Sequence, residues 1–148
     1  MKASELVIRS ASLVAPGRAL DLACGTGRNA IYLSSIGWNI IAIDIDPRVV
    51  PPASARLDVR IMDLEKMPLD FEDASFDLIA IIHYFQPSLF PVVRRLVRPG
   101  GIIVTSAKMT GRFAAGPGEL RGFFEGWELI HVFEDGAISE LIARKREC

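Results

Sequence analysis

A stretch of apolar residues, glycines and a closing carboxylate constrains the fold of this chain more than any other feature. Residues 19–44 read ALDLACGTGRNAIYLSSIGWNIIAID. The pattern predicts a buried strand over 19–23, a tight glycine loop over 24–27, a helix over 29–36 and a second strand over 39–43 that ends at Asp44. A βαβ unit of this kind binds a nucleotide-like molecule at the carboxyl ends of its strands.

The rest of the chain alternates strands with helices and then ends in a hairpin. Apolar runs predict strands over 58–62, 76–82, from 101 onward, 127–133 and 137–144, and helices after Ser4, over 89–97 and over 119–124. Pro51 and Pro52 predict a short or irregular second crossover, and residues 107–118 are expected to form a mobile loop. This alternation predicts a doubly wound α/β fold with a mostly parallel sheet and an antiparallel C-terminal hairpin.

Length and composition bound the organisation of the chain. The 148 residues predict one domain, with a short N-terminal helix in 1–17, a cofactor-binding core in 18–106, and a loop, short helix and hairpin in 107–148. The net charge of −1 argues against nucleic-acid or anionic-membrane binding. Cys24 and Cys148 match no metal spacing, so no metal is expected. With no signal peptide and no long apolar run, the expected location is the cytoplasm.

The glycine loop alone does not choose between nucleotide cofactors. Residues 25–30 satisfy the pattern G-x-G-x-x-A, which dinucleotide folds share. Asp21, however, lies within the end of the first strand, where dinucleotide folds usually carry only apolar residues, and a carboxylate there suits a cationic amino group. An aspartate also closes each of the next two strands, at Asp44 and Asp63. A dehydrogenase would normally need a further substrate domain as well.

The ordered series of motifs resembles the class I S-adenosylmethionine-dependent methyltransferases. The series is LDLACGTG, AIDID, DLE, FDLIAII and LVRPGGIIVTS, and it extends over almost the whole chain. The segments GTGRNAIYLSSIGW and ELRGFFEGWELI…LIARK are similar to small bacterial methyltransferases of the tellurite-resistance type. The resemblance implies a Rossmann-like, seven-stranded sheet in the order 3-2-1-4-5-7-6, with S-adenosylmethionine as the cofactor.

The resemblance also implies how the methionine end of the cofactor is held. Asp21 would face the methionine amino group, directly or through water. Cys24, Gly25 and Gly27 would bring backbone close to the methionine. Gly27 and the start of the following helix, where Asn29 lies, would offer N–H groups to the methionine carboxylate.

The nucleoside end has its own implied residues. Asp44 would accept hydrogen bonds from both ribose hydroxyls, at the spacing expected of a ribose-binding acid. Ile45 would pack on the adenine, Asp63 would accept from the adenine amino group, and Leu64 would offer its backbone N–H to the ring. Ala23 stands where the family often has a first glycine, a mild departure that a tight turn should tolerate.

The methyl acceptor is expected over the end of the fourth strand. Methyl transfer is an in-line displacement that mainly needs alignment and a water-poor pocket, and a base is needed only when the acceptor carries a proton. His83 is the candidate base, and packing at the strand end is its alternative role. Tyr84 is expected to wall the pocket. Arg28 and Arg112 are candidates for contacting an anionic substrate.

We therefore expect a methyltransferase whose acceptor is an oxyanion, a thiol or a small metabolite, the acceptor class resting on the resemblance alone. Two alternatives stay open. One is an NAD(P)-dependent oxidoreductase or nucleotide-binding module, and the other is a catalytically idle cofactor-binding or interaction subunit. A short N-terminus and a short loop over 107–118 would leave the methyl site open, which suits a large substrate or a covering partner chain, for example in a homodimer.

Overall fold

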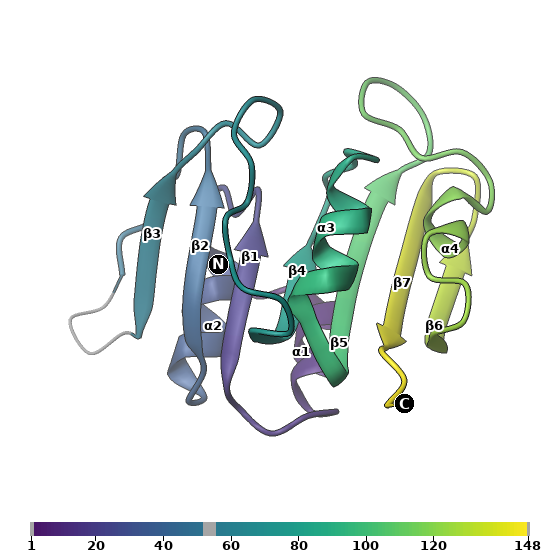
Figure 1. Ribbon diagram of the computed structural model, residues 1–148. Coiled ribbons are helices and arrows are strands. Elements are labelled where there is room, and N and C mark those ends of the chain that lie inside the picture. The colour runs from purple at the N-terminus through teal and green to yellow at the C-terminus, as the bar shows by residue number, and fades with distance from the viewer. Residues whose placement is uncertain (1, 52–55, 148) are drawn as a thin grey trace.

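The described residues form a seven-stranded sheet with helices on both faces (Figure 1). A computed structural model describes residues 2–51 and 56–147. The elements are α1 Glu5–Ala11, β1 Arg18–Leu22, α2 Arg28–Ser35, β2 Asn39–Asp44, β3 Leu57–Ile61, β4 Phe76–Ile81, α3 Leu89–Leu96, β5 Val97–Lys108, α4 Glu119–Gly122, β6 Glu128–Glu134 and β7 Ile138–Arg144.

The strand order is β3-β2-β1-β4-β5-β7-β6, which confirms the predicted fold class. Strands β1 to β5 pair in parallel, and β7 lies antiparallel between β5 and β6. Strands β1 and β4 are neighbours at the centre of the sheet. From β1 the chain continues through β2 to β3 toward one edge, and from β4 it continues through β5 toward the other edge. The strand order therefore reverses between these two strands, and a crevice at the carboxyl ends of parallel strands forms at such a point.

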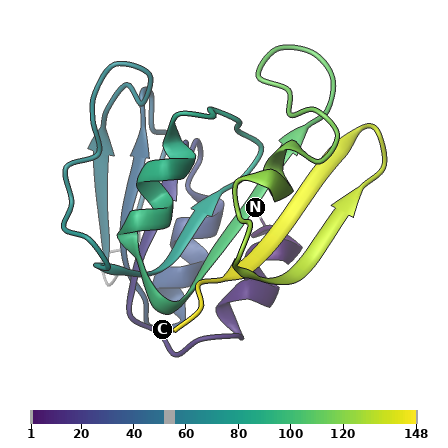
Figure 2. The same cartoon turned by 45° about the vertical axis from the view of Figure 1, so that its right-hand side comes forward.

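Two apolar layers enclose the sheet. Helices α3 and α4 cover one face, and α1 and α2 cover the other (Figure 2). Strand β4 contributes to both layers, because Phe76, Ile79 and Ile81 pack on the α3 side whereas Leu78 and Ala80 pack on the α2 side. Burial on both faces explains why this strand reads as an uninterrupted apolar run.

The predicted start of the fifth strand is wrong by four residues. Helix α3 ends at Leu96 and β5 begins at Val97, so the Pro99–Gly101 segment lies inside the strand. The pairing with β4 shifts register here, and Gly100, at φ +85°, donates its N–H to the Lys145 carbonyl at 2.7 Å. The segment is therefore a bulge held by the chain beyond β7, a partner that local sequence does not reveal.

The two predicted irregular segments have different outcomes. The second crossover was predicted to be short or irregular, and its described residues 45–51 contain no helix. Pro52 and Cys148 lie outside the described residues. The expected loop over 107–118 is wrong at its first two residues, because β5 continues to Lys108. The loop then returns to the sheet, where the N–H of the buried Ala115 donates to the Lys108 carbonyl at 2.9 Å.

The turn after β1 places a non-glycine residue in the left-handed region. Ala23, Gly25 and Gly27 have φ values of +59°, +54° and +76°. Only the glycines adopt this conformation without steric cost, because the Cβ of alanine crowds the following carbonyl oxygen. Replacing the family's glycine by Ala23 is therefore a strained departure rather than the mild one expected from the sequence.

We expect Ala23→Gly to stabilise the protein by about 0.5–1 kcal/mol, because relief of the left-handed strain exceeds the entropy that glycine adds to the unfolded chain. Equilibrium unfolding in urea measures the change. Ala30→Gly is the matched control, since Ala30 is buried inside α2 and the same exchange there should destabilise. Equal destabilisation by both variants would contradict the strain at Ala23.

Candidate functional site

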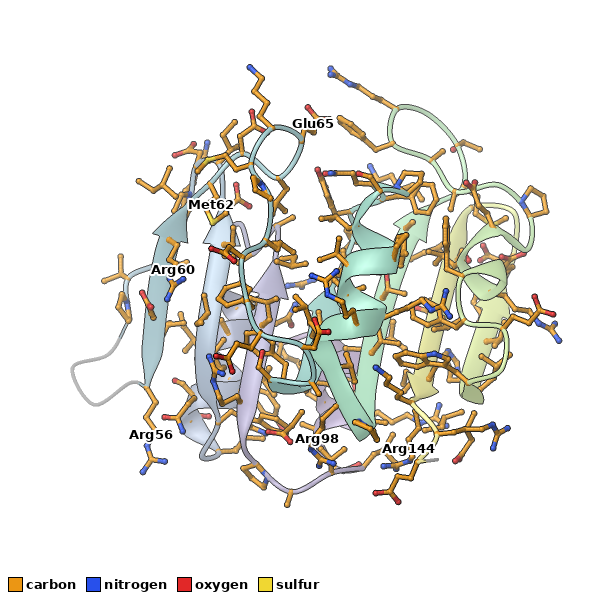
Figure 3. All side chains as sticks on the ribbon, viewed as in Figure 1. Arg56, Arg60, Met62, Glu65, Arg98 and Arg144 are labelled. Atoms are coloured by element: carbon orange, nitrogen blue, oxygen red, sulfur yellow. The ribbon has the colours of Figure 1, made fainter. Side chains whose placement is uncertain are left out.

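A cavity of about 290 Å³ lies at the carboxyl ends of the central strands. Its lining residues lie at or just after the ends of β1, β2, β3 and β4 or come from the loop after β5: Ala23, Asp44, Ile45, Met62, Asp63, Leu64, Glu65, Tyr84 and Phe113. Met62 and Glu65 are labelled at this upper edge of the sheet in Figure 3. The fold thus gathers at one edge four residues assigned to the nucleoside end, namely Asp44, Ile45, Asp63 and Leu64.

The Asp44 carboxylate joins the loops that follow β1 and β2. Its Oδ2 accepts the Gly25 N–H at 2.8 Å, and its Oδ1 accepts the Asp46 N–H at 3.0 Å. The Arg48 N–H donates to the Gly25 carbonyl at 2.9 Å, so the two loops are held at a second point. Each carboxylate oxygen can accept more than one hydrogen bond, which leaves acceptor capacity toward the cavity.

Close packing demands glycine at the start of α2. Gly27 is the N-cap of the helix, and a Cβ there would lie 2.6 Å from a Val49 methyl carbon. The crossover after β2 therefore rests directly on the glycine loop. The first turn of α2 contains no acidic residue, and the Ala30 N–H in that turn hydrogen-bonds to the Asp21 carboxylate. The other N–H groups at the helix start could meet an anion.

Asp21 is a buried carboxylate with an unsatisfied oxygen. The residue is 2% exposed, and its Oδ2 has no hydrogen-bond partner within the described part of the chain. Burial and, after it, the nearby Asp44 charge raise the pKa of Asp21 to about 7, although the Ala30 N–H and the Arg28 charge oppose the rise. An unpartnered carboxylate oxygen beside a glycine loop fits a cationic ligand group.

Two of the predicted residues are engaged away from the cavity. The buried side chain of Asn29 accepts the Ser4 N–H at its Oδ1, at 2.8 Å, and thereby ties the start of α1 to α2. Burial, followed by the charges of Asp21 and Asp44, raises the pKa of the Cys24 thiol to about 12, so the thiol stays protonated. The Cys24 backbone is still part of the turn, because its N–H donates to the Ile43 carbonyl at 3.0 Å.

The nucleoside residues differ in exposure. Ile45 is 63% exposed at the rim, whereas Leu64 is buried in the cavity wall. The Asp63 Oδ1 accepts the Glu65 N–H at 3.0 Å, which shapes the turn after β3. A flat apolar group in the cavity would therefore meet aliphatic side chains and, at the same edge, carboxylate acceptors.

The two residues expected near the acceptor, both just after β4, lie in different environments. Tyr84 lines the cavity, whereas His83 is exposed, has φ +57° and donates its N–H to the Ser106 Oγ at 3.0 Å. The Tyr84 hydroxyl donates to the Gln86 Oε1 at 2.6 Å. Burial, then the charges of Glu65 and Asp63, raise the pKa of Tyr84, so the side chain remains a neutral phenol.

Sequence reasoning missed Phe113, which lines the cavity, and Gln86, which supports the wall from behind. Gln86 donates from its Nε2 to the Leu64 carbonyl at 2.8 Å and so connects the end of β4 to the turn after β3. Phe113 lies with its ring centroid 6.0 Å from that of Tyr84, and the Arg112 guanidinium lies 4.8 Å from the Phe113 centroid. A polar residue shortly after a strand end was a usable signal for Gln86. Phe113 depends on the path of its loop, for which the sequence offers no signal.

A larger cavity at the opposite end of the sheet is a poorer candidate. It measures about 550 Å³ and includes Arg98 and Arg144, both labelled at the lower edge in Figure 3. These cations already have partners, because Arg98 pairs with Asp77 and the Arg144 Nη1 donates to the Gly100 carbonyl at 3.0 Å. These contacts within the fold explain why Arg98 and Arg144 lie together here.

The described residues carry neither a metal-binding cluster nor a helix that could span a membrane. Over residues 2–51 and 56–147, no three His, Cys, Asp or Glu side chains gather as metal ligands would. No helix in the same ranges has the length and apolar character needed to span a bilayer.

Comparison with known proteins agrees with this geometry. Residues 20–105 match the methyltransferase domain family. Hemagglutinin 1 of Eikenella corrodens is 30% identical over an alignment of 156 residues in length. That alignment covers 90% of this chain and 52% of that protein. The probable S-adenosyl-L-methionine-dependent methyltransferase TehB of Haemophilus influenzae is 22% identical over 149 residues, covering 87% of this chain and 52% of TehB. The chain thus spans about half the length of these curated relatives.

Solved structures share the fold. The TehB crystal structure superposes with a TM-score of 0.80 at 19% identity, over 95% of this chain and 61% of that one. A Burkholderia thailandensis 1,6-didemethyltoxoflavin-N1-methyltransferase, crystallised with 1,6-didemethyltoxoflavin and S-adenosylhomocysteine, superposes with a TM-score of 0.69 at 18% identity, over 96% and 76% of the two chains. With the family match, the strand order and the cavity at the switch point in agreement, the chain belongs to the methyltransferase domain family, among the class I S-adenosylmethionine-dependent methyltransferases.

Proposed function

We propose that this chain binds S-adenosylmethionine at the carboxyl edge of its sheet and transfers the methyl group to a small acceptor. The observation that carries the proposal is the buried, unpartnered Oδ2 of Asp21 beside the glycine loop. The ammonium group of methionine would pair with this oxygen. A dinucleotide would instead bring its pyrophosphate to the same loop, where a buried carboxylate would repel it.

The other residues of the site support the nucleoside half of the proposal. Asp44 faces the cavity with acceptor capacity for the ribose hydroxyls, and its hydrogen bond to Gly25 keeps the loop in position. Ile45 and Leu64 supply apolar contacts for the adenine, with Asp63 as the acceptor for its amino group. The cavity volume suits an adenine-sized group rather than a second nucleotide.

Catalysis on this proposal depends mainly on alignment. The cofactor, when bound, supplies an activated methyl group on a sulfonium. Tyr84 and Phe113 wall the approach and exclude water, and the Tyr84–Gln86–Leu64 chain of hydrogen bonds holds that wall. An acceptor that carries a proton needs a base, and we assign this role to His83, which is solvent-accessible at the end of β4.

The acceptor class, the location and the assembly belong to the proposal too. A structural neighbour crystallised with 1,6-didemethyltoxoflavin supports a small-molecule acceptor, and we retain oxyanions, thiols and small metabolites as the classes to screen. The free thiol of Cys24 is compatible with a reducing cytoplasm. A homodimer would provide a partner chain to cover the approach beside Phe113.

Calorimetric titration with S-adenosylhomocysteine and with NADH tests the cofactor. The wild-type protein should bind S-adenosylhomocysteine and not NADH, and Asp44→Ala should lose roughly 1–3 kcal/mol of that affinity because ribose hydroxyls lose their acceptor. Asp58→Ala is the control, since Asp58 is an exposed carboxylate on β3 paired with Arg60. Preferential NADH binding would replace the proposal with an oxidoreductase, and unchanged affinity in Asp44→Ala would remove the ribose assignment.

The affinity for S-adenosylhomocysteine should rise with pH. Asp21 titrates at a pKa of about 7 in the unliganded protein, and only its ionised form pairs with an ammonium group. Raising the pH from 6 to 7.5 should therefore tighten binding roughly eightfold, in proportion to the ionised fraction. The same shift predicts that the unliganded protein loses stability as the pH rises through 7. Asp21→Asn should abolish both trends, and their persistence in that variant would assign them to another group.

His83→Asn should slow methyl transfer to a proton-carrying acceptor by roughly 10²–10⁴-fold, because the variant has no base. Asparagine tolerates the left-handed backbone at this position, so the fold should be preserved. Turnover is measured with an acceptor identified from a panel of thiols, oxyanions and phenols. S-adenosylhomocysteine affinity should not change, and wild-type turnover would leave His83 as a packing residue.

A further inference from the structure

The side-chain amide of Gln86 has only one orientation that its neighbours allow. Its Nε2 donates to the Leu64 carbonyl at 2.8 Å and to the Ser88 Oγ at 3.0 Å. A carbonyl oxygen can only accept, so the nitrogen of the amide must face Leu64 and the amide oxygen must face away from it. The Gln86 Oε1 is therefore fixed as an acceptor, and it lies 2.6 Å from the Tyr84 hydroxyl oxygen.

This acceptor determines where the proton of the Tyr84 hydroxyl points. A phenol carries one proton, and Tyr84 donates it to the Gln86 Oε1. Burial and, after it, the charges of three carboxylates raise the pKa of Tyr84, and these carboxylates line the same cavity as the tyrosine. The phenol thus stays neutral beside the cavity, and it offers a ligand there its oxygen lone pairs but no donor.

The charged side chains that line the cavity are acidic, and none of its described lining residues is Lys, Arg or His. Asp44 and Asp63 are assigned to the nucleoside, whereas Glu65 has no such role. Its exposed side chain lies at the upper edge of the sheet (Figure 3), and no salt bridge joins it to a cation within the described ranges. The loop after β5 contains Arg112, but its exposed guanidinium lies 4.8 Å from the Phe113 ring centroid. An anion in the cavity would therefore meet negative charge and no cationic side chain.

We propose that Tyr84 and Glu65 make the site select a neutral or cationic methyl acceptor that presents an N–H or O–H group, with the Tyr84 oxygen accepting from that group. The proposal rests on the proposed function, because such an acceptor binds beside the cofactor. It narrows the acceptor classes by excluding oxyanions, whose lone pairs and charge would face those of Tyr84 and Glu65. Gln86 is then a positioning residue, since it acts on the acceptor only through the Tyr84 proton.

Two probes of the same shape test this preference. Benzamidine is a cation with N–H donors on a planar ring, whereas benzoate is an oxyanion with acceptors only. In calorimetric titrations into protein saturated with S-adenosylhomocysteine, the wild-type protein should bind benzamidine about 10- to 100-fold more tightly than benzoate. Tyr84→Phe should weaken benzamidine binding by about 10-fold, because the ring stays and the accepting oxygen is lost. Glu65→Gln should reduce the preference severalfold, because the side chain keeps its size and loses its charge.

Gln86→Leu separates the direction of the Tyr84 proton from the charge of the site. The substitution leaves the net charge unchanged and frees the Tyr84 hydroxyl to donate into the cavity. Benzamidine should therefore bind more weakly, and benzoate more tightly, than in the wild-type protein. Ser88→Ala is the matched control, because it removes one partner of the Gln86 amide and leaves the Leu64 carbonyl to fix its orientation. The control should show the wild-type preference.

Each other outcome has a distinct meaning. A wild-type protein that prefers benzoate or binds neither probe would overturn the inference, and so would a Gln86→Leu variant with the wild-type preference. If Tyr84→Phe loses as much affinity for S-adenosylhomocysteine as for benzamidine, the tyrosine belongs to the cofactor site and the inference is also overturned. A wild-type protein that does not bind S-adenosylhomocysteine would instead overturn the proposed function. If Gln86→Leu does not fold, Gln86→Met serves in its place, since a thioether is only a weak acceptor for the Tyr84 proton.

Discussion

The hydrogen bonds of the Asp44 carboxylate hold the site together. They join the Gly25 N–H, in the loop after β1, to the Asp46 N–H, in the segment after β2. The cavity walls and the contact of Val49 with Gly27 at the start of α2 depend on these two loops keeping their relative positions. The same carboxylate raises the pKa of Asp21, so the structure concentrates negative charge where a cationic ligand would neutralise it.

The sheet topology explains why these groups meet. Strands β1 and β4 are neighbours, and their crossovers leave in opposite directions, so the loops after them diverge and open a crevice. Ala23 and Tyr84 line the cavity from the ends of these two strands. The antiparallel pair β6 and β7 extends the sheet beyond β5, away from this crevice. We therefore expect the choice of methyl acceptor to depend on the loops after β4 and β5, where Gln86 and Phe113 lie.

Residues at strand ends were the predictable part of the site. Asp44, Ile45, Asp63 and Leu64 follow apolar runs, and in a parallel sheet the residues after such runs share one edge, so their meeting at the cavity required no knowledge of the loops. The direction of a side chain within a loop or at a helix start was not predictable. Asn29 illustrates this, because its amide is taken by the Ser4 N–H from an element 25 residues away in sequence.

The sequence by itself determined the class of the fold, the strand order by resemblance, and the edge on which the site lies, because apolar periodicity and glycine position act over a few neighbouring residues. Only the tertiary structure decided that Ala23 is strained, that β5 begins in a bulge held by Lys145, and that Phe113 covers Tyr84. Each of these depends on segments distant in the chain being brought into contact. The same holds for Asp21, because its carboxylate is buried and accepts the Ala30 N–H only once β1 and α2 have packed together.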